Sequence, residues 1–149
     1  MSDDVHRQIG VERFNASWDL IDKGAARSPD DDVELLLSAM TSRWHWGQVG
    51  GPEEVSTGDW QVAHAACLLG LGDLALLFAR RNLATATERG WSGWRLASAH
   101  EGMARASAVA GDADGRSRHL AAAEAALANE PDAEESRIIA SQLATVPSV

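Results

Sequence analysis

The sequence predicts an all-α protein of six to seven antiparallel helices arranged in stacked hairpins. Apolar residues recur at helical spacing along most of the chain, alanine is abundant, and glycine or proline separates the helical stretches. Patterns typical of strands are nearly absent. The chain has 149 residues, a length that suits one domain. We therefore expect a single helical domain over residues 1–149.

The first two predicted helices have clear boundaries. Residues 5–23 carry apolar side chains on one face, and Gly24 is suited to end this helix. Ser28 is a suitable N-cap for the second helix, because Pro29 and three aspartates follow it. The glycines and proline of residues 47–52 then predict the clearest loop in the chain. The residues expected on the buried face of the second helix are Val33, Leu36, Leu37, Met40 and Trp44.

Five further helices are predicted after that loop. Glycine residues are suited to end them, and aspartate or serine residues are suited to begin them. The connections are short, so neighbouring helices should fold back antiparallel. The predicted helices cover residues 59–71, 73–89, 93–110, 116–128 and 131–146, with Asp73, Ser92 and Asp112 as N-caps.

A weak internal repeat links two of the predicted hairpins. The stretches GLGD (70–73) and VAGD (109–112) recur at an offset of 39 residues, each between two alanine-rich helices. This pattern resembles tetratricopeptide-type helical hairpins, in which small residues and a Gly-Asp turn occur at similar places. The resemblance implies a short helical array, with weak repeats over about 59–90 and 92–129 and a capping helix over about 131–146.

The whole chain also resembles a family of small bacterial proteins. The residues that carry this resemblance are SRWHWGQVG, GDWQVAHAACLLGLGD and HEGMARASAVAGD. The resemblance implies a helical-repeat fold and brings no assigned activity.

Charge and cysteine content restrict the partners and the compartment. The formal net charge is -9, which disfavours binding to nucleic acid and to anionic membrane surfaces. Cys67 is the single cysteine, so no disulfide forms within the chain, as fits a reducing cytoplasm. The first ten residues are acidic and polar, unlike a signal peptide, and no apolar stretch is typical of a membrane span. We expect a cytoplasmic protein.

The stretch SRWHWGQVG (42–50) is the first candidate for a site. Successive helical residues turn by ~100°, so Trp44 and Trp46 point roughly 200° apart and cannot form one aromatic clamp. Trp44 continues the predicted buried stripe. Two interpretations stay open for His45 and Trp46: they belong to a helix end that is buried on two sides, or they face a pocket beneath the glycine loop.

The pocket interpretation extends to residues on later helices. Glu101 and Arg105 form a favourable i,i+4 pair, and Glu101 shares a largely apolar helix face, where it would lie at an edge or line a concavity. A carboxylate beside tryptophan rings suits a cationic or amine-bearing ligand. The candidate binding residues are His45, Trp46, Trp60, Glu101 and Arg105.

A metal site or a catalytic site is the alternative. His64 and Cys67 are three residues apart and share a helix face, so with His100 or His45 they would form a ligand set. No H-x-x-x-H or H-E-x-x-H spacing and no second cysteine support this set. Cys67 lies in an apolar run, which predicts an inert, buried thiol.

These observations predict a non-enzymatic protein- or peptide-binding or scaffolding module that needs no cofactor. The expected partner is a protein or peptide with basic segments, and self-association into a homo-oligomer stays open. The alternative is a small-molecule- or metal-binding helical enzyme that uses His45, His64 and His100.

Overall fold

The computed structural model describes residues 1–149 and contains helices but no strands, so the predicted all-α class is confirmed. None of its helices combines the length and apolar character needed to cross a membrane. In chain order the elements are α1 (Asp3–Asp22), the short 3₁₀ helix η1 (Gly24–Ala26), α2 (Pro29–Val49), α3 (Pro52–Leu68), α4 (Gly72–Glu88), α5 (Gly93–Val109), α6 (Ala113–Leu127) and α7 (Ala133–Ala144).

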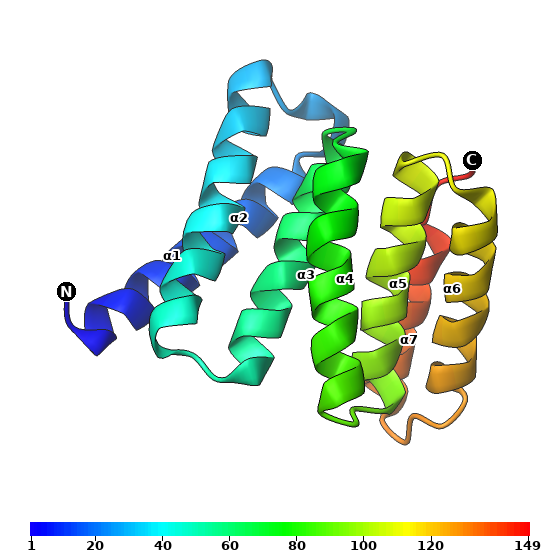
Figure 1. The fold of residues 1–149 in the computed structure, drawn as a ribbon. Helices are drawn as coiled ribbons and strands as arrows, with labels where there is room; N and C mark the ends of the chain where they lie inside the picture. Colours follow the sequence, from blue (N-terminus) through cyan, green and yellow to red (C-terminus); the bar gives the residue numbers. More distant parts are fainter.

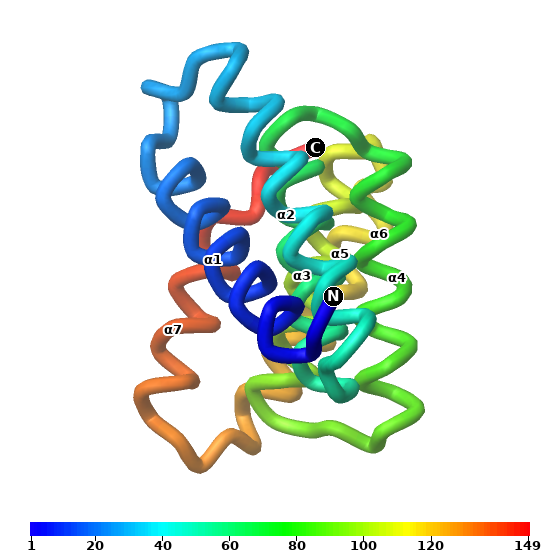
Figure 2. Tube along the Cα trace, turned by 90° about the vertical axis from the view of Figure 1, so that its left-hand side faces the viewer, coloured from blue at the N-terminus to red at the C-terminus, as the bar shows by residue number.

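Consecutive helices pack against each other as three hairpins, α1–α2, α3–α4 and α5–α6, followed by α7. Helices α3 to α6 stand side by side (Figure 1), and α3 also contacts both α1 and α5. Helix α7 packs against α5 and α6. Figure 2 shows that α1 and α7 lie on the same side of the molecule, although they are at opposite ends of the chain.

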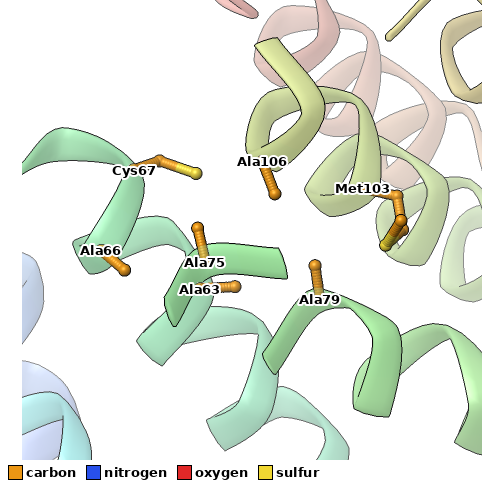
Figure 3. Packing of buried hydrophobic residues seen from close by; sticks show 7 residues of the cluster. All are labelled: Ala63, Ala66, Cys67, Ala75, Ala79, Met103 and Ala106. Atoms are coloured by element: carbon orange, nitrogen blue, oxygen red, sulfur yellow. The ribbon is translucent and has the colours of Figure 1, made fainter. Parts of the chain in front are cut away.

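The largest core cluster joins α3, α4 and α5, and its members are mostly alanine (Figure 3). Small side chains let helix backbones approach closely, so the abundance of alanine serves packing as well as helix propensity. Cys67 belongs to this cluster and is buried, as expected from the apolar run around it. The buried members are Ala63, Ala66, Cys67, Ala75, Ala79, Met103 and Ala106.

Two of the predicted helix starts are confirmed by their hydrogen bonds. Ser28 and Asp31 form a reciprocal capping box at the start of α2, with both hydrogen bonds 3.0 Å long. Asp112 accepts a hydrogen bond of 2.8 Å from the backbone N–H of Gly115 at the start of α6. These caps satisfy N–H groups that have no partner within the helix.

Of the other two predicted caps, Asp73 is wrong and Ser92 is right in position only. Asp73 lies within the first turn of α4, whose N-cap position is Leu71. Ser92 occupies the N-cap position of α5, but its side chain makes no capping hydrogen bond. The carboxylate of Glu130 replaces it, accepting a hydrogen bond of 2.7 Å from the backbone N–H of Trp94. A capping group 36 residues away leaves no local signal in the sequence.

Two turns of similar geometry end α3 and α5, but they do not have the predicted 39-residue spacing. Gly70 and Gly111 both have positive φ, +72° and +82°, and each follows the end of the first helix of a hairpin. In both turns the next N–H reaches back to a carbonyl five residues earlier, Leu71 to Ala66 and Asp112 to Ser107. The equivalent glycines are thus 41 residues apart (111 minus 70). The 39-residue match aligns residues that do not occupy equivalent positions.

The predicted loop at 47–52 is much shorter than expected. Helix α2 continues to Val49 and α3 already begins at Pro52, seven residues before the predicted start at residue 59. Gly58 lies inside α3, where an added Cβ would come within 2.8 Å of Cδ of Arg43 on α2. Gly58 therefore marks a close approach of two helices, although in the sequence it favours a loop.

The buried face of α2 also differs from the predicted stripe. Val33, Leu37 and Trp44 are 60%, 56% and 56% exposed. Small residues face α1 instead, and the hydroxyl of Ser42 donates a hydrogen bond of 2.7 Å to the backbone carbonyl of Gly10. Leu36 and Met40 of the predicted stripe are partly buried, and Leu20 and Ile21 of α1 pack against the core cluster that contains Leu35. The buried residues of α2 are Leu35, Ser38, Ala39, Ser42 and His45.

Candidate functional site

A cleft opens between α1 and α7, the two helices that share one side of the molecule in Figure 2. It has a volume of about 490 Å³, and α3 and α5 contribute much of its lining. Five of the six tryptophans of the chain line it. They come from α1, α2, α3, the residues before α5, and the first turn of α5, and they are Trp18, Trp46, Trp60, Trp91 and Trp94.

Stacked aromatic rings form one part of this cleft. Trp18 and Trp60 stack with ring centroids 5.8 Å apart, and Trp60 stacks on His64 at 4.9 Å. Burial lowers the pKa of His64 to about 3, so its imidazole is neutral at physiological pH. His64 therefore extends an apolar aromatic stack and is poorly suited to act as a base near pH 7.

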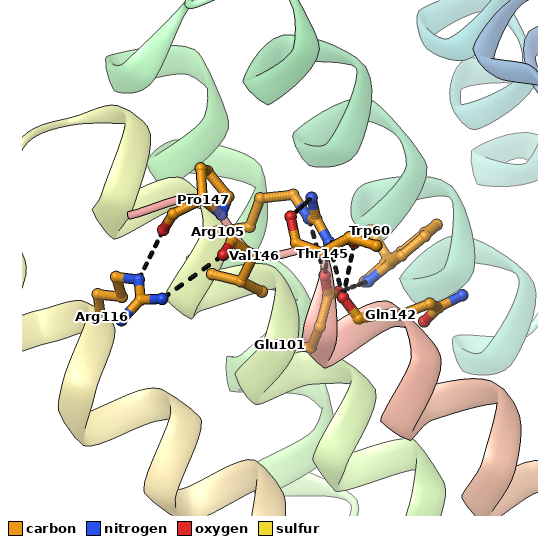
Figure 4. Close-up of polar contacts among 8 residues, drawn as sticks. All are labelled: Trp60, Glu101, Arg105, Arg116, Gln142, Thr145, Val146 and Pro147. Carbon is orange, nitrogen blue, oxygen red and sulfur yellow. Dashed lines mark hydrogen bonds and ion pairs between the residues drawn. The ribbon is translucent and has the colours of Figure 1, made fainter. Parts of the chain in front are cut away.

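A buried ion pair positions Trp60. The indole N–H of Trp60 donates to Glu101 at 3.0 Å, and Glu101, which is fully buried, pairs with Arg105 at 2.7 Å. Arg105 in turn donates to the backbone carbonyls of Gln142 and Thr145 at the end of α7 (Figure 4). The same network therefore orients a cleft tryptophan and holds α7 against α5.

Glu101 and Arg105 consequently do not face a groove, in contrast to the sequence-based hypothesis. Glu101 is 0% exposed and Arg105 is 6% exposed, and neither belongs to the lining of the cleft. Glu101 instead lies in the interior, where Arg105 and the indole N–H of Trp60 neutralise and bind its carboxylate. A buried charge is tolerated when it is paired and hydrogen-bonded in this way.

Two residues that line the cleft beside the rings each have a buried, unpaired amide oxygen. Asn82 is 7% exposed, and its amide group donates to the carbonyl and the hydroxyl of Ser56 at 3.0 and 2.7 Å. The oxygen of the Asn82 amide is buried without a hydrogen-bond partner, and so is the amide oxygen of Gln142. Figure 4 shows the Gln142 side chain extending away from the Glu101–Arg105 pair. Both residues line the cleft, but the two oxygens themselves are buried and are not exposed to it.

A charged rim borders the same cleft. Glu53 and Glu54 from α3 and Glu135 from α7 contribute carboxylates, and Arg95 from α5 contributes the one cationic side chain of the lining. Arg95 forms an ion pair with Glu53. The hydrogen bond from Arg95 lowers the pKa of the Glu53 carboxyl group. The lining therefore has an excess of negative charge next to aromatic surface.

The stretch SRWHWGQVG contributes only one side chain to this cleft. Trp46 lines it and packs against α1, where an added Cβ on Gly10 would come within 2.9 Å of the Trp46 indole. His45 is buried and shares a hydrogen bond of 2.9 Å between the Nδ1 atoms with His6 of α1. The expectations of a buried Trp44 and of a pocket-facing His45 are both wrong. Helix α1 covers the His45 face of α2 and leaves Trp44 exposed.

The histidines proposed as metal ligands lie in separate places. His45 pairs with His6, His64 stacks on Trp60, and His100 shares a hydrogen bond of 3.0 Å with His119. No three histidine, cysteine, aspartate or glutamate side chains come close enough to hold a metal ion. The structure therefore does not bring His64, Cys67 and His100 together as a ligand set.

The thiol of Cys67 is poorly suited to nucleophilic attack in this environment. Burial raises the pKa of the Cys67 thiol to about 12, so the thiolate is scarce at neutral pH. The thiol packs among the alanines of the core and does not line the cleft. Cys67 therefore acts as a small apolar core residue.

Sequence reasoning identified Trp46 and Trp60 but missed most of the cleft. The available signal was compositional: six tryptophans and no tyrosine in one chain. Trp91 and Trp94 are three residues apart, but no local spacing connects them with Trp18, Trp46 and Trp60, which lie on α1, α2 and α3. The missed residues that matter most are Trp18, Asn82, Trp91, Trp94, Arg95 and Gln142.

The fold and the site together define an all-helical protein with an open, tryptophan-lined cleft. No protein-family model, no curated protein and no solved structure matches this chain.

Proposed function

We propose that this protein is a non-enzymatic binding module of the tetratricopeptide-like type, and that its cleft holds an apolar peptide segment carrying a basic side chain. The observation that carries the proposal is the gathering of Trp18, Trp46, Trp60, Trp91 and Trp94 around one open cleft. Aromatic side chains dominate the energetics of recognition surfaces, because they bury a large area with few rotatable bonds.

The chemistry of the polar groups supports a cationic ligand. Indole faces attract cations, and five of them line the cleft. Carboxylates of the rim add electrostatic attraction, and the net charge of -9 extends it beyond the cleft. A ligand that is both apolar and basic satisfies all of these groups.

The arrangement of the helices supports comparison with a tetratricopeptide-like array. The first helices of the three hairpins, α1, α3 and α5, all contribute to the cleft, as expected for a concave binding face. Helix α7 closes one end of that face, which makes the cleft deeper than an open groove.

A binding role fits the state of the titratable groups better than a catalytic role does. Burial keeps His64 neutral and Cys67 protonated near pH 7, because it lowers the pKa of His64 to about 3 and raises that of Cys67 to about 12. A general base or nucleophile works best with a pKa near the operating pH.

Binding of a small aromatic or aliphatic amine is the second candidate function. The cleft volume of about 490 Å³ favours it, since pockets for small molecules commonly enclose about 300–1,000 Å³.

A displayed library of random peptides, selected on the immobilised protein, tests the first proposal. We expect enrichment of sequences with arginine or lysine beside apolar residues. A synthetic peptide of the enriched sequence should change the tryptophan fluorescence on binding. Trp91→Ala should weaken that binding at least about tenfold, the scale of an aromatic contact at an interface.

Trp44→Ala is the matched control, because Trp44 is 56% exposed and lies outside the cleft. Its affinity for the peptide should equal that of the unaltered protein. Enrichment of acidic peptides, no enrichment at all, or equal loss in both variants would contradict the proposal.

A further inference from the structure

We propose that Arg95 is an internal occupant of a guanidinium subsite at the mouth of the cleft, and that a ligand's own cationic group binds there by displacing it. The subsite consists of Trp91, Trp94 and Glu53. The inference rests on the proposed binding role of the cleft and identifies the chemical group that enters this part of it.

The geometry is that of a bound cation. The guanidinium carbon of Arg95 lies 5.1 Å from the ring centroid of Trp94 and 5.4 Å from that of Trp91. Both distances are within the range of about 6 Å over which a cation is attracted by a ring face. The carboxylate of Glu53, on a different helix, completes the set by forming an ion pair with the same guanidinium. Two indoles and one carboxylate therefore surround a single positive charge.

Arg95 is held there weakly. The side chains of Arg95 and Glu53 are 34% and 58% exposed, and Arg95 forms no other hydrogen bond with the protein. Exposed ion pairs contribute little to stability, because solvent screens them. Arg105 provides the contrast within the same helix, since it is 6% exposed and also donates to Gln142 and Thr145. Arg105 has a structural role, whereas Arg95 is free to leave its position at low cost.

The subsite favours guanidinium over other cations. A guanidinium group is planar, so it stacks on an indole while its N–H groups donate to a carboxylate. An ammonium group has the charge but cannot stack as a plane. Arginine side chains of a peptide, or small molecules with a guanidinium group, are therefore the ligands that reproduce the contacts of Arg95.

Titration with benzylguanidinium, followed by tryptophan fluorescence, tests the inference directly. We expect Arg95→Gln to bind this probe about five- to tenfold more tightly than the unaltered protein, because no internal cation competes for the rings. Arg95→Lys, which keeps the charge but loses the planar group, should show a smaller gain. Benzylurea, a neutral analogue of similar shape, should bind weakly to all variants.

Arg89→Gln is the matched control for the loss of one positive charge. Arg89 borders a neighbouring shallow pocket together with Glu53 and Trp91, but its charge does not lie over either ring. Its affinity for benzylguanidinium should change less than about twofold, as expected for a screened surface charge. Equal gains in Arg89→Gln and Arg95→Gln would show a general field effect and overturn the inference.

Three further outcomes are decisive. Weaker binding by Arg95→Gln would show that Arg95 itself contacts the ligand, and absence of binding in every variant would show that the rings accept no guanidinium. Either result overturns the inference. Binding of benzylguanidinium with the expected gain, while the peptide library yields nothing, would support the subsite and reject the peptide proposal. Circular dichroism of each variant establishes that the helices are retained.

Discussion

At the scale of single residues, two tryptophans with similar sequence contexts have opposite roles. Trp60 is 7% exposed, stacks between Trp18 and His64, and donates a hydrogen bond to Glu101. Trp44 is 56% exposed and contacts only the imidazoles of His6 and His45 among aromatic groups. Each follows polar residues in the sequence, TSR before Trp44 and STGD before Trp60. These neighbours do not indicate which of the two tryptophans is buried.

This difference predicts unequal costs of truncation. Trp60→Ala should lower the free energy of unfolding by about 3–5 kcal/mol, the usual range for aromatic truncation in a core. Trp44→Ala should lower it by less than about 1 kcal/mol, as for most surface substitutions. Urea denaturation followed by circular dichroism measures both values. Similar costs for the two variants would mean that Trp44 is buried by a contact absent from the monomer.

At the scale of elements, α7 is attached by the apolar packing of Ile139 and Leu143 and by one buried arginine. Arg105 binds two backbone carbonyls at the end of α7, and it neutralises Glu101, which no other cation contacts. Arg116 also reaches the C-terminal segment, with a hydrogen bond of 2.6 Å to the carbonyl of Pro147 (Figure 4). The two arginines differ in burial, because the contact of Arg116 with Pro147 is exposed.

Arg105→Ala should therefore destabilise the protein by about 3–5 kcal/mol, because it leaves a buried carboxylate without a partner. Arg116→Ala, the matched control, should cost about 0.5–1.5 kcal/mol, the net value of an ordinary hydrogen bond. Hydrogen exchange should accelerate across α7 in the first variant and remain nearly unchanged in the second. Unchanged protection of α7 in Arg105→Ala would contradict the assigned role.

At the scale of the whole molecule, histidine burial makes stability depend on pH. Burial is the first cause that lowers the pKa of His45, His64, His100 and His119 in the folded protein, and for His64 the value falls to about 3. The unfolded chain has ordinary histidine pKa values near 6.5, so below that pH it binds more protons than the folded protein. The free energy of unfolding therefore has its full value, with respect to these histidines, above about pH 6.5, and it declines as the pH falls towards 3.

Each histidine that stays neutral in the folded protein should lower the free energy of unfolding by up to about 1.4 kcal/mol for each pH unit below pH 6.5. Chemical denaturation at pH 7, 6 and 5 measures the slope. His64→Phe should flatten the curve, because phenylalanine preserves an aromatic ring beside Trp60 and does not titrate. The Nδ1 atom of His64 has no hydrogen-bond partner, so the substitution breaks no hydrogen bond at that atom. An identical pH slope in the variant would contradict the low pKa of His64.

The sequence by itself determined the helical class, some helix boundaries such as the start of α2 and the turn at Gly111, and the burial of Cys67. These properties depend on local interactions, such as the capping box of Ser28 or the positive φ of Gly111, or on the apolar run around a residue. Helix propensity, caps and glycine turns act over a few residues, so their signals survive without knowledge of the neighbours.

Only the tertiary structure decided which faces are buried and where a site forms. Val33, Leu37 and Trp44 of the predicted face of α2 are exposed, while the small residue Ser42 contacts the backbone of Gly10 on α1. Glu130 caps a helix from 36 residues away, and five tryptophans from separate parts of the chain line one cleft. The physical reason is that the face which a helix buries depends on the shape of the helices packed against it, and this shape is set by distant parts of the chain.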